Sequence, residues 1–550
     1  MYQMNIKILL LLLFITLTGG LLRFYQLDKY PVQLNHDEIS QLYDTDSVAQ
    51  TGKDIYGNFL PLAFPSTGEF KVGHYIYITV LPYFIFGARE VTIRIPAAFF
   101  GTLIIPAVFL FIHQLTKNRK LALISAAVIA ITPSEIFYSR KSFENIIGTF
   151  FVFCGLFALF RQLERNQGRF GPLLTALLLA LPMYIYTSHT IVVPFTVGVF
   201  ALLFRRKIRP LYKRFLMMLI VWIILLLPLV YITLNNPGIR FRASTVSIFQ
   251  DANLTNQLQN IKQNNLVLSA IYQVKTVLEF SSTKYLKQFD PTYIFASGLD
   301  LTNQGMIGMG PLMLLQLPFF LLGIIYIVKP PFFLNNGKFL LALIFLAMLP
   351  SGFTYEEFSP HRSVWAFSIM SIISSFGIFW FFQVIQKIFS MPIRAGLMCI
   401  FVLLLIINFV YFIHIYTVNF PFEKSQSIHY PYKQVALFAW SKHDQFDHII
   451  VDPVYGQSAP VKAVAVHYYL AYYGNYPPAK FQKDLKIEKS GMSFDKFIVR
   501  EIDWSKDQNL RNTLIIASPW SIPTETIDKN KIIQRFDFYD GQPAFYAIKL

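Results

Sequence analysis

Carboxylates gather near the start of this chain, in a segment that separates two apolar stretches. Four of them fall within ten residues, at Asp37, Glu38, Asp44 and Asp46. A carboxylate can take the proton from an acceptor hydroxyl during a group transfer. The loop of residues 23–92, which holds all four, is longer than a connector needs to be, so we interpret it as a candidate catalytic loop.

Cations and hydrogen-bonding groups follow in the same loop and in two shorter segments. They are Lys71, His74, Arg89 and Arg94, then Tyr138, Arg140, Lys141 and Glu144, and later His361 and Arg362. Cations stabilise a phosphate leaving group as charge develops on it. Taken singly, each residue is equally explained as a solvated loop residue or an interfacial anchor. Their predicted location on one side of a membrane favours a site for transfer from a phosphate-linked donor.

The elements that must position these groups are membrane helices. The chain is 54% hydrophobic and 14% charged, against about 25% charged residues in soluble domains. A spanning helix needs roughly 20 apolar residues. We therefore expect an α-helical polytopic membrane protein with about 11 to 13 transmembrane helices, eleven of them near 5–22, 93–115, 120–137, 145–161, 171–186, 190–204, 214–233, 310–328, 338–353, 363–381 and 394–416.

The charge of the short loops sets the expected orientation, because Lys and Arg collect in cytoplasmic loops. Basic loops at 117–120, 161–169, 205–214, 329–338 and 383–394 all fall inside if the N-terminus is cytoplasmic. The loops 23–92, 138–144, 187–189, 234–309 and 354–362 then face out, together with everything after residue 416.

Residues 74–87 test this scheme, because they are apolar but short and contain Pro82. Counting them as a span would put the basic cluster 117–120 outside. We therefore interpret them as a helix in the outer interface, where Tyr- and Phe-rich amphipathic segments often lie. A true short span is the rival interpretation.

Residues 417–550 have the composition of a soluble domain. They carry 16 Lys and Arg against 14 Asp and Glu, so most of the net charge of +17 belongs to residues 1–416 and to their short loops. This pattern indicates topology signals and lipid contacts and argues against nucleic acid as a partner. A helical pattern at 431–442 and strand patterns at 448–452, 513–517 and 544–549 predict a small extracytoplasmic α/β domain.

Several runs of the sequence resemble, in order, the bacterial phospholipid-carrier-dependent glycosyltransferases. These are enzymes of the GT-C class, related to protein O-mannosyltransferases and to the aminoarabinose transferase of lipid A. The runs are Arg23-Phe-Tyr-Gln-Leu27, His36-Asp-Glu38, 51–61, Phe86-Gly87 with Arg94-Ile-Pro96, Pro133 with Tyr138-Ser-Arg140 and Glu144, 289–295 with Gly298, Gly310-Pro311, Leu317-Pro318 and Pro360-His-Arg362.

The resemblance implies a role for each site residue. Asp37 is the general base that activates the acceptor, and Glu38 supports it. The carrier phosphate is held by Lys71, His74, Arg94, Arg140, His361 and Arg362, while Tyr138, Glu144 and Tyr186 face the acceptor or the sugar. The Pro-Pro that commonly follows the family's Lys is replaced here by Val72-Gly73, between Lys71 and His74.

The resemblance also implies the reaction and its partners. A sugar moves with inversion from a polyprenyl-phosphate donor to a protein, lipid or cell-surface glycan acceptor, outside the plasma membrane of a bacterium. Some enzymes of this class hold a divalent metal through acidic residues and others do not; neither the carboxylate spacing nor the two cysteines, both inside apolar runs, favours either case.

A membrane transporter or lipid flippase is the alternative function. Transporters place ionisable groups near the membrane centre, whereas the predicted helix centres here are almost free of charge. A non-catalytic scaffold is a third interpretation, and it predicts that Asp37 is dispensable. The aromatic run 466–473 could contact a sugar or acceptor, or could be a core helix of the C-terminal domain.

Overall fold

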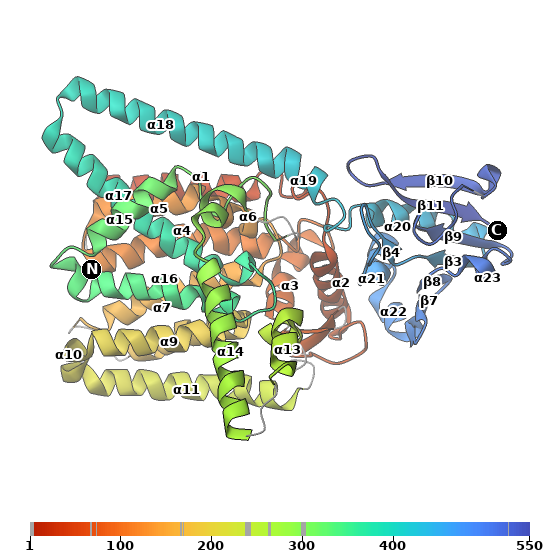
Figure 1. The fold of residues 1–550 in the computed structure, drawn as a ribbon, viewed down its shortest axis with the longest axis horizontal. Helices are drawn as coiled ribbons and strands as arrows, with labels where there is room; N and C mark the ends of the chain where they lie inside the picture. Colours follow the sequence, from red (N-terminus) through yellow and green to blue (C-terminus); the bar gives the residue numbers. More distant parts are fainter. Residues whose placement is uncertain are drawn as a thin grey trace. The chain divides into compact units, whose positions relative to one another are not determined.

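The structure is a computed structural model that describes residues 5–66, 69–72, 74–164, 168, 170–236, 244–261, 266–298, 304–525 and 527–550. The chain forms two compact units, and each combines segments that are distant in sequence. We call residues 1–25 with 97–416 the helical unit, and residues 26–96 with 417–550 the sheet unit. Each unit is described by itself below (Figure 1).

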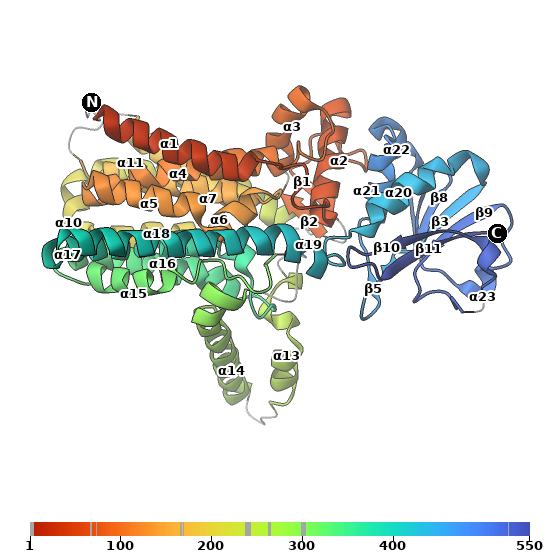
Figure 2. The ribbon, with the colours of Figure 1, turned by 90° about the horizontal axis from the view of Figure 1, so that it is seen from above.

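The helical unit contains a helix at every one of the eleven apolar ranges predicted to span the membrane. Most of these helices run side by side in both views (Figures 1 and 2). The unit also contains three helices outside these ranges: α10 (Arg205–Ile208), α13 (Ala252–Gln259) and α14 (Leu266–Lys287). The helices within the ranges are α1 (Ile6–Phe24), α4 (Ile95–Thr116), α5 (Arg119–Ile131), α6 (Pro133–Ser139), α7 (Glu144–Arg161), α8 (Gly171–Ile185), α9 (Ser188–Leu203), α11 (Tyr212–Asn235), α15 (Gln316–Ile327), α16 (Asn336–Gly352), α17 (Val364–Ile388) and α18 (Met391–His414).

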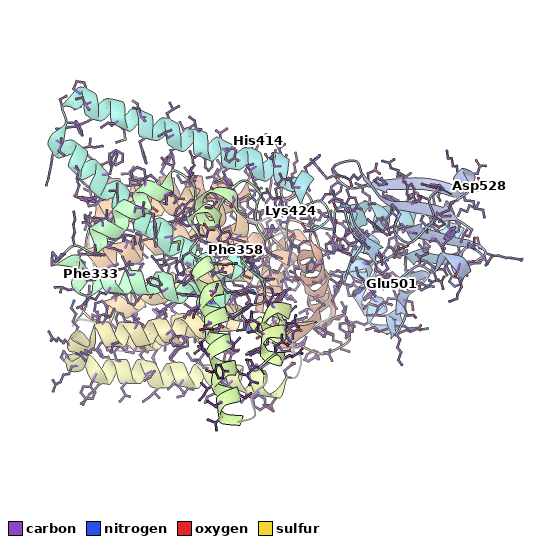
Figure 3. All side chains as sticks on the ribbon, viewed as in Figure 1. Phe333, Phe358, His414, Lys424, Glu501 and Asp528 are labelled. Carbon is purple, nitrogen blue, oxygen red and sulfur yellow. The ribbon has the colours of Figure 1, made fainter. Side chains whose placement is uncertain are left out.

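Within the described residues, six helices are long and apolar enough to cross a membrane. A seventh candidate is the pair α5 and α6, which is bent by 56°. Helices α8, α9, α15 and α16 are apolar but shorter, at 12 to 17 residues. Apolar side chains remain exposed along α18, as a lipid-facing helix requires (Figure 3). The chain is a multi-pass membrane protein.

The bend between α5 and α6 has a local cause. Pro133 has no N–H to give to the carbonyl of Ile129, so the helical ladder stops there. Arg23 at the end of α1 supplies donors at this bend: its guanidinium lies 3.1 Å from the carbonyl oxygen of Ala130 and 3.4 Å from that of Ile129. It also lies 2.9 Å from the carbonyl oxygen of Gly19 in its own helix. A Cβ at Gly19 would lie 2.3 Å from the Ile105 side chain, so glycine allows α1 to lie close to α4 at this point.

The sheet unit is built on a seven-stranded sheet with the order β10-β11-β9-β3-β8-β7-β6. Its centre, β9-β3-β8, is parallel, and its outer pairs are antiparallel. The strands are β3 (His448–Val451), β6 (Lys486–Glu488), β7 (Gly491–Phe494), β8 (Phe497–Arg500), β9 (Thr513–Ala517), β10 (Ile532–Asp537) and β11 (Pro543–Lys549). Two separate hairpins are β1 (Ala63–Ser66)–β2 (Glu69–Val72) and β4 (Val454–Tyr455)–β5 (Val461–Lys462).

Helices from both segments of the chain complete this unit. They are α2 (His36–Thr51), α3 (His74–Phe86), α19 (Phe420–Glu423), α20 (Pro431–Ser441), α21 (Val466–Tyr473), α22 (Pro478–Asp484) and α23 (Trp504–Asp507). The predicted helix 431–442 and the predicted strands coincide with α20, β3, β9 and β11.

Helix α2 of the first loop packs against α21 and α22 of the C-terminal segment. The Tyr43 hydroxyl donates to the carbonyl of Tyr476 at 2.7 Å, and the Tyr469 hydroxyl to the carbonyl of Leu34 at 2.6 Å. Tyr468 and Tyr469 are fully buried, so the aromatic run 466–473 is a core helix. The two units divide between residues 416 and 417, where the sequence predicts a domain boundary, and residues 26–96 belong by contact with 417–550.

Helix α3 matches the segment predicted to lie in the interface. It packs on α2 through Ile76, which joins Val48 and Phe64 in a small buried cluster. Its opposite face leaves Leu81, Phe84 and Ile85 about 70% exposed. This two-sided apolar character suits a helix between protein and lipid, and its place at the interface stays a prediction.

Candidate functional site

Asp37 lies in the first turn of α2, where a capping box fixes the backbone. The Asn35 side chain accepts from the backbone N–H groups of Asp37 and Glu38 at 2.9 Å each, and Glu38 accepts from the N–H of Asn35 at 3.2 Å. Such reciprocal bonds satisfy donors that a helix start leaves open. The sequence pattern Asn-x-x-Glu therefore anchors the residue predicted to be the base.

Glu38 and Arg94 form a buried ion pair behind Asp37. Arg94 Nε donates to Glu38 Oε1 at 3.0 Å. The same guanidinium donates to the backbone carbonyls of Leu27, Pro31 and Gln33 at 2.9 to 3.0 Å. These contacts tie the segment before α2 to the start of that helix and support a positioning role for both residues. A contact of Arg94 with phosphate stays a prediction.

The other three of the four clustered carboxylates are buried. Asp46 accepts from the Tyr83 hydroxyl of α3 at 2.5 Å and from Gln50 at 2.7 Å. Asp44 accepts from the Tyr468 hydroxyl at 3.4 Å. Glu38, Asp44 and Asp46 are at most 8% exposed, whereas the Asp37 side chain is 34% exposed. Of the four carboxylates, Asp37 is the one that a substrate can reach.

Two histidines that sequence reasoning did not assign lie next to Asp37. His36 Nε2 is 3.6 Å from Asp37 Oδ1, and the His36 ring centroid is 5.2 Å from that of His429. Burial, with a smaller effect of His36, lowers the pKa of His429 to about 3, so its imidazole is neutral at physiological pH. The position of His36 directly before Asp37 was an available signal, but nothing in the sequence pointed to His429.

Lys71 and His74 occupy the hairpin and helix that follow. Lys71 pairs in register with Phe64 between β2 and β1, and its side chain lies outside the described part of the structure. His74 is the first residue of α3. Their assignment to the carrier phosphate therefore stays a prediction.

The remaining predicted site residues lie in the helical unit, around the turn that follows α6. The Arg140 guanidinium donates to the backbone carbonyls of Leu22 and Arg23 at 2.9 and 3.2 Å, and to the Tyr416 hydroxyl at 3.2 Å. Glu144 begins α7, and Tyr186 ends α8 with its ring 6.2 Å from that of His189.

A short 3₁₀ turn, Pro360–Arg362, carries the last two predicted phosphate ligands. The carbonyl of His361 accepts from the Asn145 side chain at 2.5 Å. Arg362 lies 3.2 Å from the His361 ring nitrogen and 3.5 Å from a carboxylate oxygen of Glu356. The turn is thus tied to the start of α7.

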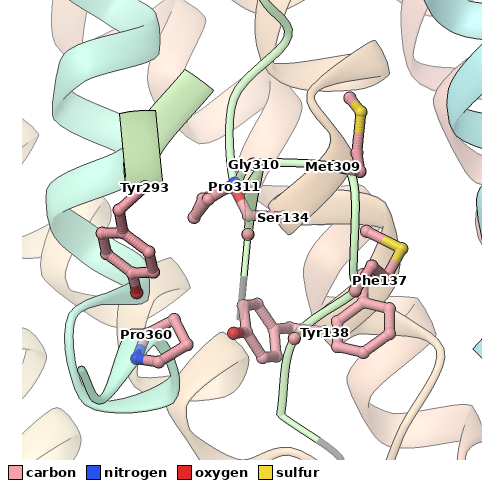
Figure 4. A pocket seen from close by; sticks show the side chains of 11 residues that line it. Ser134, Phe137, Tyr138, Tyr293, Met309, Gly310, Pro311 and Pro360 are labelled. Atoms are coloured by element: carbon pink, nitrogen blue, oxygen red, sulfur yellow. The ribbon is translucent and has the colours of Figure 1, made fainter. Parts of the chain in front are cut away.

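A small cavity lies between this turn and Tyr138 (Figure 4). The Tyr138 hydroxyl donates to the carbonyl of Gln304 at 2.6 Å. Its empty volume is about 280 Å³, and its lining includes Ser134, Phe137, Tyr138, Tyr293, Gly298, Met306, Met309, Gly310, Pro311 and Pro360. Gly298 has φ +60°, and a Cβ there would lie 2.0 Å from the Met306 carbonyl oxygen. The pieces of the family resemblance from three separate segments therefore converge on one cavity.

A second, partly open cavity lies among α5, α15, α17 and α18, with about 920 Å³ of empty space that includes its opening. Apolar side chains such as Ile124, Phe319 and Phe401 line most of it. Among the described residues, no three His, Cys, Asp or Glu side chains gather closely enough to hold a metal ion.

The model of one protein family, the dolichyl-phosphate-mannose-protein mannosyltransferases, matches residues 74–232. No curated protein matches the chain.

Solved structures match much more of the chain. ArnT from Cupriavidus metallidurans bound to undecaprenyl phosphate is 11% identical, with a TM-score of 0.53 over 98% of this chain and 97% of that one. The Archaeoglobus fulgidus oligosaccharyltransferase tethered with an acceptor peptide is 11% identical, with a TM-score of 0.50; the match covers 85% of this chain and 63% of that one.

At these identities the structural likeness shows the fold, which is that of GT-C membrane glycosyltransferases. The chain therefore has the fold of the GT-C membrane enzymes, and its residues 74–232 are similar to the dolichyl-phosphate-mannose-protein mannosyltransferases.

Proposed function

We propose that the protein transfers a sugar from a polyprenyl-phosphate donor to an acceptor hydroxyl outside the cytoplasm, with inversion and with Asp37 as general base. The observation that carries this proposal is the burial pattern of the first loop, in which Asp37 is the accessible carboxylate of four. Its backbone is fixed by the Asn35 cap. A fixed and accessible carboxylate is what a base requires.

A lipid-linked donor is supported by the relatives and by the shape of the helical unit. ArnT binds undecaprenyl phosphate, and the matching family uses a dolichyl-phosphate sugar. The apolar cavity among α5, α15, α17 and α18 suits the tail of such a lipid. Lys71, His74, Arg140, His361 and Arg362 are the groups we assign to the carrier phosphate.

The reaction we propose is a single displacement. The acceptor oxygen forms a bond to the anomeric carbon while its proton passes to Asp37. The bond between that carbon and the phosphate oxygen breaks, and the electron pair leaves with the carrier phosphate. The cations assigned to the carrier phosphate stabilise this oxygen as its charge grows. The sugar inverts because attack and departure take place on opposite faces.

We place the site and the C-terminal domain on the outer side of a bacterial plasma membrane, because the basic loops all fall on the other side. The acceptor is a protein, a lipid or a cell-surface glycan. A peptide is the first to test, since the oligosaccharyltransferase structure holds one.

Purified Asp37→Asn protein tests the proposal with a panel of polyprenyl-phosphate sugars and acceptors. Loss of a general base costs about 10²- to 10⁴-fold in rate, so we expect turnover to fall by that factor while the unfolding midpoint is unchanged. Asp28→Asn, at an exposed acid of the same loop, serves as control and keeps wild-type turnover. The anomeric configuration of the product reports inversion.

Wild-type turnover by Asp37→Asn would overturn the assignment of the base. It would leave the transporter and scaffold interpretations, which both make Asp37 dispensable.

A further inference from the structure

His429 occupies an aromatic cage in the C-terminal segment of the sheet unit. The residue has φ +59°, a region that histidine adopts more often than most residues. Its side chain is buried, and its ring lies 5.5 to 6.2 Å from the rings of Tyr432, Tyr455 and Tyr469. The cage comes from α20, β4 and α21, so three elements fix the ring.

Each tyrosine of the cage is itself anchored by its hydroxyl. Tyr432 donates to the carbonyls of Asp452 and Pro453 at 3.3 and 3.2 Å, and Tyr455 to that of Gln426 at 2.8 Å. Tyr469 donates to the carbonyl of Leu34, directly before the Asn35 cap. The cage is therefore tied to the backbone that sets the start of α2.

The contact of His429 with His36 extends this series of contacts to Asp37. The two rings are tilted by 53° with centroids 5.2 Å apart, and His36 Nε2 lies 3.6 Å from Asp37 Oδ1. The Nδ1 atoms of both histidines are buried without a hydrogen-bond partner in the described structure. Packing of one ring on the other therefore sets the position of His36.

We propose that the C-terminal domain completes the Asp37 site, with His429 and His36 as positioning residues. This inference rests on the proposed function of Asp37. The ring of His429 is held in place by its cage, and the ring of His36 packs against it. His36 in turn orients the carboxylate of Asp37 toward the acceptor. A base misplaced by about 1 Å can lose about 100-fold in rate, so this support affects turnover more than substrate binding.

The experiment measures kcat and KM for His36→Ala, His429→Ala and the double variant in the full-length protein. We expect each single change to lower kcat by about 10- to 100-fold, with both KM values unchanged. The double variant should be no slower than the slower single one, because both changes remove the same support. His467→Ala is the matched control: His467 is equally buried in the same domain, and it packs on the ring of Tyr468.

His467→Ala should lose stability as His429→Ala does but keep wild-type kcat. If His429→Ala does not fold, His36→Ala decides the question, because this side chain is 29% exposed and tolerates removal. Wild-type kcat in a folded His36 or His429 variant, or independent losses that multiply in the double variant, would overturn the inference.

Asp37→Asn separates this result from failure of the proposed function. If Asp37→Asn abolishes transfer while the histidine variants turn over normally, only the positioning role is wrong. If Asp37→Asn is active, the base assignment fails first.

Discussion

Asp37 and Glu38, which are adjacent at the start of α2, differ in how far they are exposed to solvent. Asp37 is partly exposed, whereas Glu38 is buried against Arg94. Removing one partner of a buried ion pair leaves an unpaired charge and costs about 3–5 kcal/mol. We therefore expect Glu38→Ala to lower the unfolding midpoint strongly, in contrast to Asp37→Asn.

The matched test of this pair is the double variant Glu38→Leu with Arg94→Met, which removes both charges and keeps apolar volume. Such replacements are often neutral in stability. Recovery of the midpoint in the double variant would show that Glu38 acts through Arg94. A Glu38→Ala protein as stable as the wild type would contradict the buried-pair explanation.

Because two histidines of the sheet unit are buried, we expect the folded protein to be less stable at acidic pH. Burial lowers the pKa of His429 to about 3 and that of His467 to about 4, from an ordinary value of about 6.5. Below pH 6.5 the unfolded chain binds protons at both positions while the native state does not. The free energy of unfolding therefore decreases as the pH is lowered from about 6.5 to about 4, by about 1.4 kcal/mol per pH unit for each histidine. Above about pH 6.5 neither histidine reduces the stability.

Unfolding midpoints measured at pH 7.5, 6 and 5 check this prediction, with His467→Leu as the comparison. The variant should lose less stability on acidification than the wild type, because one of the two groups no longer titrates. Equal pH dependence in the two proteins would show that His467 is not the source.

At the scale of elements, Lys284 at the end of α14 fastens the segment that leads to the His361–Arg362 turn. Its ammonium lies 2.6 Å from Asp251 Oδ2, 2.5 Å from the carbonyl oxygen of Tyr355 and 3.4 Å from that of Thr354. The side chains of Lys284 and Asp251 are only 11% and 14% exposed. We expect Lys284→Met to loosen residues 354–362, seen as faster hydrogen exchange there, and to raise the KM for the lipid donor.

Lys287→Met is the control for this change. Lys287 pairs with Glu357 at 2.7 Å, but both side chains are about half exposed, and such surface pairs contribute at most about 1 kcal/mol. Its exchange pattern and KM should match the wild type. Equal effects of the two substitutions would show that loss of charge, and not the buried contacts, is responsible.

The sequence predicted the membrane helices well because their signal is local. A spanning helix needs a contiguous apolar run, and each predicted run proved to be a helix. The strand 513–517 was equally clear, since it is buried on both faces. Helix α2 was not predicted, although Asn35 and Glu38 carry a capping pattern, because its sequence is mostly polar and contains no contiguous apolar run.

The candidate site was predictable only in part. Asp37 and its loop stood out by composition and resemblance, but Glu38 and Arg94 could not be separated from surface charges without knowing their burial. His429 had no sequence signal, since its contact with His36 depends on packing between distant segments. The association of residues 26–96 with 417–550 escaped prediction for the same reason.

At the scale of the whole molecule, that association has a consequence for biosynthesis. Tyr43 bonds to a carbonyl that lies 433 residues later in the chain. At 5–20 residues per second, a ribosome needs roughly 20 to 90 s to make that interval. Until then, the Tyr43 side chain, which packs on Tyr468 and Phe481 in the finished protein, lacks these partners. The loop with the proposed base is thus among the first segments translated and the last to mature, so an enzyme halted within its final domain would be inserted in the membrane yet inactive.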